Sequence, residues 1–104
     1  MSVFAVHYTY DHRTAERDQV RPAHRAFLAG LHDDGTLLAS GPYGGPTTGL
    51  EAEPDGALLL VRADDAAACE RVLDADPFAL SGLVAQRAVR PWTPVFGPWG
   101  DAPA

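Results

Sequence analysis

The sequence is poor in positive charge. It has eight basic residues, all of them arginine, against 14 acidic ones, and its formal net charge is -6. The arginines are scattered singly, so the chain lacks the clustered basic surface that binding to nucleic-acid phosphates requires. We therefore expect no nucleic-acid partner.

Long apolar runs and paired cysteines are also missing. No stretch approaches the roughly 20 apolar residues that span a bilayer, and no charged region followed by a long apolar segment indicates a signal peptide. The single cysteine, Cys69, cannot form a disulfide within the chain, and we expect it to be a small packed residue and not a nucleophile. These features favour a cytoplasmic protein with no membrane partner.

The patterns of metal and phosphate sites are absent as well. A metal site would need three or four convergent ligands, and the spacing from His24 to His32 is not such a pattern. The segment from Gly41 to Gly49 lacks the lysine and the following helix of a phosphate-binding loop. We expect neither a metal nor a cofactor.

What the chain does contain fits one small domain, with 104 residues of which 46% are hydrophobic. Alternating apolar residues predict a strand over Val3 to Tyr10, and a run that is apolar on both faces predicts a buried strand over Ala57 to Arg62. Shorter strands are predicted from Thr36 to Ser40, ended by Gly41-Pro42, and from Val84 to Trp92.

Two helices are predicted between these strands. The first runs from Ala15 or Asp18 to Asp34, with Pro22 tolerated only near its start and Gly35 ending it. The second begins with Asp64 as its N-cap, and a short helical turn follows it. The glycine- and proline-rich stretch from Tyr43 to Asp55 predicts a mobile loop.

The resulting order, β-α-β-β-α-β, is that of a ferredoxin-like α+β fold with a four-stranded antiparallel sheet and helices on one face. The other face still carries apolar side chains, so we expect a second copy to cover it and form a homodimer. Trp92 and Phe96 are expected in the core or at that interface. Residues 1–97 are predicted to form the domain and residues 98–104 a tail.

One titratable side chain lies on the inward face of the first predicted helix. Phe27, Leu28 and Leu31 follow His24 by three, four and seven positions, so His24 points toward the interior. Histidine is the side chain best suited to move protons near neutral pH. A histidine in this place is either a satisfied core residue or part of a site, and its spacing alone leaves both open.

Several short motifs occur in order along the chain: Arg21-Pro22-Ala23-His24, Leu31-His32-Asp33-Asp34-Gly35, Leu37-Leu38-Ala39-Ser40-Gly41-Pro42, Asp74-Ala75-Asp76-Pro77-Phe78, Gly82, Val89-Arg90-Pro91-Trp92 and Val95-Phe96-Gly97. Together they resemble the YciI-like family, or YCII-related domain. The resemblance covers Val3 to Gly97 and implies a dimeric α+β barrel fold.

The resemblance also implies a site centred on a histidine and an aspartate, which match His24 and Asp76. One type of member is similar to a dehydrochlorinase of chlorinated hydroxyquinols, and the wider fold includes muconolactone isomerase-like enzymes. A carboxylate beside an imidazole fixes its tautomer, but Asp76 could equally cap the helical turn after Pro77. We take His24 and Asp76 as the candidate catalytic pair, with a substrate-binding lining of Tyr8, Ser40 and Phe78.

Three functions stay open at this level. An enzyme could use His24 as a general acid and base for elimination, isomerisation or lactone chemistry on a small polar organic molecule, with no cofactor. A small-molecule-binding or accessory domain could use the same residue as a polar anchor. A structural dimer would simply bury the histidine with its hydrogen bonds satisfied.

Overall fold

The computed structural model describes residues 1–45, 48 and 54–100. Its elements are β1 (Ser2–Thr9), α1 (Thr14–Asp33), β2 (Leu37–Pro42), β3 (Gly56–Ala63), α2 (Ala66–Leu73), α3 (Pro77–Leu80) and β4 (Gln86–Trp92). This is the predicted order, with α3 as the short helical turn before the last strand. Most of the predicted loop from Tyr43 to Asp55, and residues 101–104 of the predicted tail, lie outside the described residues.

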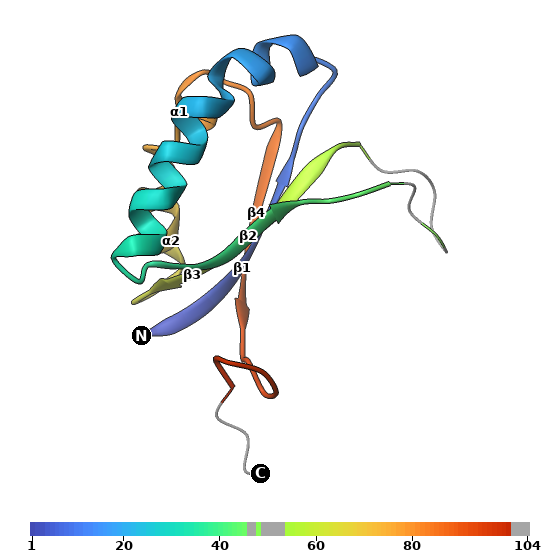
Figure 1. Ribbon diagram of the computed structural model, residues 1–104. Coiled ribbons are helices and arrows are strands. Elements are labelled where there is room, and N and C mark those ends of the chain that lie inside the picture. The colour runs from blue at the N-terminus through green and yellow to red at the C-terminus, as the bar shows by residue number, and fades with distance from the viewer. Residues whose placement is uncertain (46–47, 49–53, 101–104) are drawn as a thin grey trace.

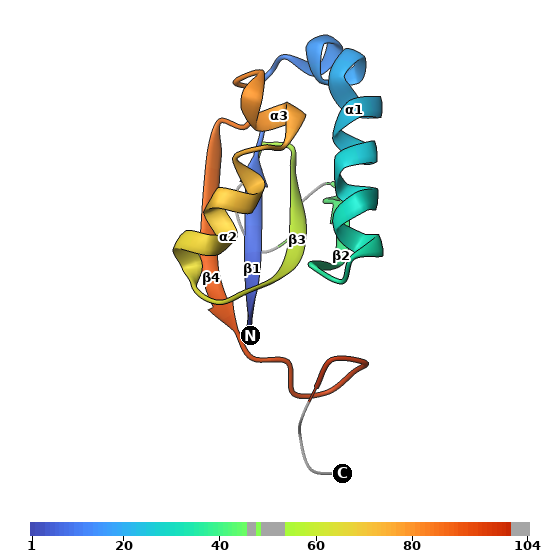
Figure 2. The same cartoon turned by 90° about the vertical axis from the view of Figure 1, so that its left-hand side faces the viewer.

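The four strands form one antiparallel sheet in the order β2-β3-β1-β4. All three helices pack on the same face of this sheet, and the opposite face is left uncovered by the described chain (Figure 1). Helix α1 lies over the β2 side, while α2 lies nearer β4 (Figure 2). The chain therefore has the ferredoxin-like α+β fold that the sequence predicts. Among the described residues, no helix has the length and apolar character needed to cross a membrane.

The central strand β1 alternates between two environments, as its sequence predicts. Phe4, Val6 and Tyr8 are buried against the helices, and the residues between them are more exposed. The neighbouring strand β3 is buried along most of its length, with Arg62 exposed. Removing these apolar side chains from water, at about 25 cal/mol per Å², stabilises the helix layer on the sheet. Other elements add Leu37, Cys69, Leu73, Phe78 and Leu83 to the core.

Helix α1 begins at Thr14, one residue before the earlier of the two predicted starts, and Pro22 lies in its interior. The reason is local: the buried guanidinium of Arg17 donates to the carbonyl oxygen of Asp11 and to the hydroxyl of Thr14, which anchors the first turn. Pro22 has no N–H to donate to the carbonyl of Asp18, four residues back, and the helix accommodates this missing bond within its length.

The inward face of α1 is the one that the sequence predicts. Leu28 and Leu31 pack against the core. His24 lies on the same face and is only 8% exposed. It is the eleventh of the 20 residues of the helix, so it is held at the middle of α1 and not at an end.

Helix α2 is capped one residue later than predicted. The carboxylate of Asp65, and not that of Asp64, accepts the backbone N–H of Ala68 at 2.7 Å. Asp65 has the extended backbone conformation that an N-cap requires. Cys69 and Leu73 on the inward face are fully buried, as predicted, and burial raises the pKa of the Cys69 thiol to about 11.

Two strand ends differ from the prediction by two residues, and the other strand bounds differ by at most one. Strand β2 continues through Gly41 and Pro42, because it lies at the edge of the sheet, where a residue without an N–H is tolerated. Strand β4 begins at Gln86, two residues after Val84, because the preceding chain still closes α3: the N–H of Leu83 donates to the carbonyl of Phe78.

Trp92 and Phe96 were expected either in the core or at a dimer interface, and the structure shows that they are not in the core of this chain. Trp92 is 39% exposed and Phe96 is 88% exposed. Trp92 belongs to an edge strand and pairs with Val3 on the uncovered face of the sheet. Their place at an interface stays a prediction.

Candidate active site

The carboxylate of Asp76 lies at the centre of the candidate site and is fully buried. Its Oδ1 accepts the backbone N–H of Phe78 at 2.9 Å, which makes Asp76 the N-cap of α3. The same oxygen lies 2.7 Å from Nδ1 of His24, and Oδ2 accepts the hydroxyl of Tyr8 at 2.9 Å. The two roles that the sequence left open, cap and partner of the histidine, therefore coexist.

The local sequence explains why the carboxylate turns inward. Asp76 precedes Pro77, which disfavours helical geometry at Asp76 and leaves its backbone extended. Pro77 itself occupies the first position of α3, where a missing N–H costs the helix nothing. The Asp76 side chain is thus directed back over the first turn of α3, toward the inward face of α1.

The imidazole of His24 has one nitrogen engaged and the other available. A hydrogen bond from Nδ1 to the Asp76 carboxylate places the proton of the neutral ring on Nδ1, so Nε2 carries the lone pair, and no other described residue forms a hydrogen bond with it. The ring also stacks on Phe78, with centroids 3.9 Å apart and planes 5° apart. Because Phe78 is itself buried, carboxylate and aromatic ring together fix the orientation of the imidazole.

His24 lines a cavity of about 200 Å³ between α1 and the edge of the sheet. Ser40 and Phe78, both expected to line the site, belong to its walls, and Leu28 and Leu59 add apolar surface. A cavity of this size, with a few polar groups among apolar ones, suits a small organic molecule.

Tyr8 takes a different place from the one expected. It is not among the residues that line the cavity, and its hydroxyl donates to the far oxygen of Asp76. Burial raises the pKa of Tyr8 well above its usual range, and the charge of Asp76 raises it further. The hydroxyl therefore remains protonated and acts on the carboxylate, not on the contents of the cavity.

Three polar residues of the cavity were missed by the sequence analysis: Tyr10, Arg21 and Arg25. Tyr10 shares the inward face of the first strand with Tyr8, which was the available signal. Burial, with a further contribution from Asp76, raises the pKa of Tyr10 to about 12. The arginines flank His24 in sequence, and helical spacing alone did not show that both reach the cavity.

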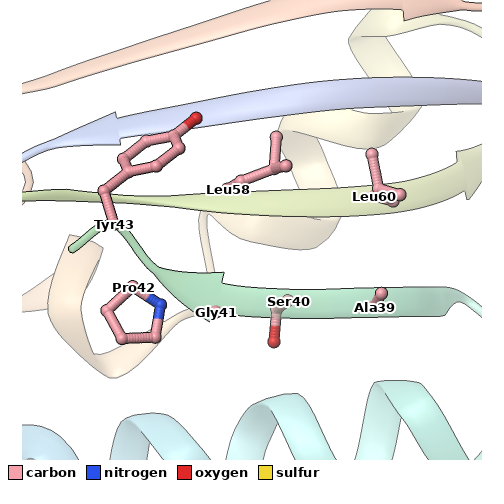
Figure 3. A pocket seen from close by; sticks show the side chains of 7 residues that line it. All are labelled: Ala39, Ser40, Gly41, Pro42, Tyr43, Leu58 and Leu60. Carbon is pink, nitrogen blue, oxygen red and sulfur yellow. The ribbon is translucent and has the colours of Figure 1, made fainter. Parts of the chain in front are cut away.

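A second hollow, of about 310 Å³, lies on the uncovered face of the sheet and is lined by Tyr43, Leu58 and Leu60. Figure 3 shows these side chains on one side of the β2–β3 pair and Ser40 pointing to the other, toward α1. The edge strand β2 therefore separates this hollow from the His24 cavity. Over the described ranges, no three His, Cys, Asp or Glu side chains gather as a metal site would require.

Two solved structures share this architecture. One is a 5-chloro-2-hydroxyhydroquinone dehydrochlorinase from Burkholderia phenoliruptrix AC1100 in complex with 2,5-dihydroxybenzoquinone; it is 25% identical, with a TM-score of 0.73 over 95% of this chain and 99% of that chain. The other is an antibiotic biosynthesis monooxygenase that is 15% identical, with a TM-score of 0.53 over 92% of this chain and 100% of that one. The second likeness concerns the fold alone.

Sequence comparison gives the family. Protein YciI of Escherichia coli O6:H1 and Protein YciI of Shigella flexneri are each 32% identical over 83 residues, which is 78% of this chain and 85% of theirs. The sequence profile of the YCII-related domain matches residues 1–93. The motifs, the fold and both comparisons agree, and the chain belongs to the YCII-related domain family.

Proposed function

We propose that the protein is a cofactor-independent enzyme that moves a proton on a small polar organic substrate. His24 is the catalytic acid-base residue and Asp76 its positioning residue, while Ser40 and Phe78 contact the substrate. Tyr8 acts through Asp76. The observation that carries the proposal is the 2.7 Å contact between the buried carboxylate and Nδ1 of His24, a residue that also lines the cavity.

Elimination is the reaction that this arrangement suits best. Nε2 of His24 takes a proton from a substrate carbon, and the electron pair of that C–H bond forms a C=C double bond. The leaving group departs from the adjacent carbon with the electron pair of its own bond. The nearby carboxylate of Asp76 stabilises the imidazolium that forms. Isomerisation shares the first step, after which His24 returns the proton to a different carbon.

The likeness to a dehydrochlorinase supports this reaction class. Dehydrochlorination removes a proton and a chloride, and so needs one proton acceptor and no redox partner. The 2,5-dihydroxybenzoquinone bound to that enzyme is a small polar ring, which is of a size that a cavity of about 200 Å³ can accommodate. We therefore propose small polar ring compounds as the substrate class.

The catalytic role predicts that His24→Gln removes turnover and spares binding. With 5-chloro-2-hydroxyhydroquinone as the test substrate, kcat for chloride release should fall by about 10²- to 10⁴-fold. Binding of 2,5-dihydroxybenzoquinone, followed by its absorbance, should persist. His12→Gln, the same change at an exposed histidine, is the matched control. Binding without turnover in the wild-type protein would instead indicate a non-catalytic binding domain.

The positioning role predicts a change of tautomer in Asp76→Ala. In ¹⁵N NMR spectra of the neutral ring, the wild-type His24 proton should reside on Nδ1, and in the variant it should shift toward Nε2, because the acceptor is gone. Asp65→Ala removes only the cap of α2 and should leave the His24 spectrum unchanged. An unchanged tautomer in a folded Asp76→Ala protein would rule out positioning by the carboxylate.

The buried carboxylate predicts unequal effects for two neighbouring tyrosines. Tyr8→Phe removes one donor from Asp76 and should lower the free energy of unfolding by about 1 to 3 kcal/mol. Tyr10→Phe removes a hydroxyl that has no hydrogen bond to another described residue, and its effect should be much smaller. Urea unfolding followed by circular dichroism measures both, and equal losses would contradict the proposed network.

We also propose that the protein forms a homodimer through the uncovered face of the sheet. Leu58 and Leu60 of β3 face this side, and Trp92 of β4 faces it opposite Val3 of β1. Apolar side chains on a sheet face that no helix covers are typical of an interaction site. A second copy offers the same face, and two-fold pairing would bury both. We place this dimer in the cytoplasm, where a lone unpaired cysteine is ordinary.

The homodimer predicts that Leu58→Asp yields a monomer in sedimentation velocity experiments at micromolar concentration, because a charge would be buried at the interface. Leu80→Asp places the same change on the helix side, where Leu80 is 73% exposed, and should remain dimeric. Circular dichroism checks that both variants are folded. A wild-type protein that sediments as a monomer would contradict the proposal.

A further inference from the structure

Two arginines stand in the wall of the His24 cavity. Arg21 precedes His24 by three residues and Arg25 follows it directly, so the two guanidinium groups are one helical turn apart. Among the described residues that line the cavity, no carboxylate accompanies them. In a chain of net charge -6, the lining of this cavity therefore carries two positive charges, while the carboxylate of Asp76 contacts His24 from outside the lining.

The two arginines differ in their partners. Arg21 forms an ion pair with Asp18 on the preceding turn, so part of its charge is already compensated. Arg25 is exposed and makes no hydrogen bond or ion pair with any described residue. Like charges one turn apart on a helix repel each other, and an anion bound beside Arg25 would relieve that repulsion.

Arg25 also lies between two adjoining cavities. Together with Ser40 and Leu28 it lines both the His24 cavity and an adjoining hollow of about 470 Å³. Its guanidinium can therefore meet a ligand that enters from solvent and reaches toward His24. The planar fork of a guanidinium donates two parallel N–H groups to an oxyanion, which a lysine cannot do.

Tyr10 adds a neutral donor on the same cavity. Its hydroxyl has no hydrogen bond to another described residue. Because burial raises the pKa of Tyr10 to about 12, the hydroxyl stays protonated near neutral pH and can donate to a ligand oxygen. The side chains of Arg25, Tyr10 and His24 thus line the same small cavity.

We infer that the site is selective for substrates that carry an oxyanion, either a carboxylate or an ionised ring hydroxyl, and that Arg25 is the residue that binds it. The reacting carbon then faces Nε2 of His24. This inference rests on the proposed function for the role of His24, and it adds the charge of the substrate and the residue that determines specificity.

The test compares an anion with its neutral isostere. Benzoate and benzamide are titrated into ¹⁵N-labelled protein, and shifts of residues around His24 report binding. The wild-type protein should bind benzoate about tenfold more tightly than benzamide. This ratio of dissociation constants corresponds to the free energy of one hydrogen bond to a charged group. Arg25→Gln should lose that preference, Arg25→Lys should keep part of it, and Arg71→Gln, at an exposed arginine on α2, should keep all of it.

A second anion separates the two sources of the oxyanion. 2,5-Dihydroxybenzoquinone, which is ionised at neutral pH, is titrated into the same variants. If Arg25→Gln weakens the binding of benzoate alone, the site is selective for carboxylates. If it weakens the binding of the quinone alone, the site is selective for ionised ring hydroxyls. Either result supports the inference. It is overturned if benzoate binds no more tightly than benzamide and Arg25→Gln weakens neither anion.

Because the measurement is binding, this test is separate from that of catalysis. Turnover that depends on His24 but shows no preference for anions would overturn this inference and leave the proposed function standing. Binding that prefers anions through Arg25, without turnover in the wild-type protein, would support the inference and overturn the enzymatic function.

Discussion

The buried carboxylate of Asp76 is the constraint on which the rest of the site depends. A carboxylate removed from water is tolerated only where donors replace its hydration, and here the donors come from β1, α1 and α3. Tyr8 and His24 are 68 and 52 residues away in sequence. The requirement to satisfy one buried charge therefore holds three separate segments in a single arrangement.

The same contact organises the chemistry of the cavity. Phe78 gives its backbone N–H to Asp76 and its ring to His24, so one residue fixes both members of the pair. With Nδ1 held by the carboxylate, Nε2 is the ring nitrogen that has no hydrogen bond to another described residue. The proposed anion selectivity depends on the arginines on either side of His24, which line the same cavity. His24, Arg21 and Arg25 line one small cavity, and the buried carboxylate of Asp76 contacts His24 from outside that lining.

Much of the fold follows from local pattern. The alternation along β1, the two-sided apolar run of β3 and the inward stripe of α1 predict which face of each element is buried, because burial follows the period of the backbone. The ends of the elements do not follow from this pattern. Asp64 and Asp65 are equally capable caps by residue type, and only the backbone conformation selects Asp65. Pro42 belongs to a strand only because that strand lies at an edge.

For the site, helical spacing places His24 on the inward face, and the family resemblance that the motifs carry makes Asp76 its candidate partner. The contact between the two residues could not be predicted, because helical spacing gives the face on which a side chain lies but not the residues that pack against that face. Tyr8 and Tyr10 share one face of a strand, yet one lies behind the carboxylate and the other lines the cavity. That difference, like the position of Arg25, arises only when α1, α3 and the sheet close around the buried charge.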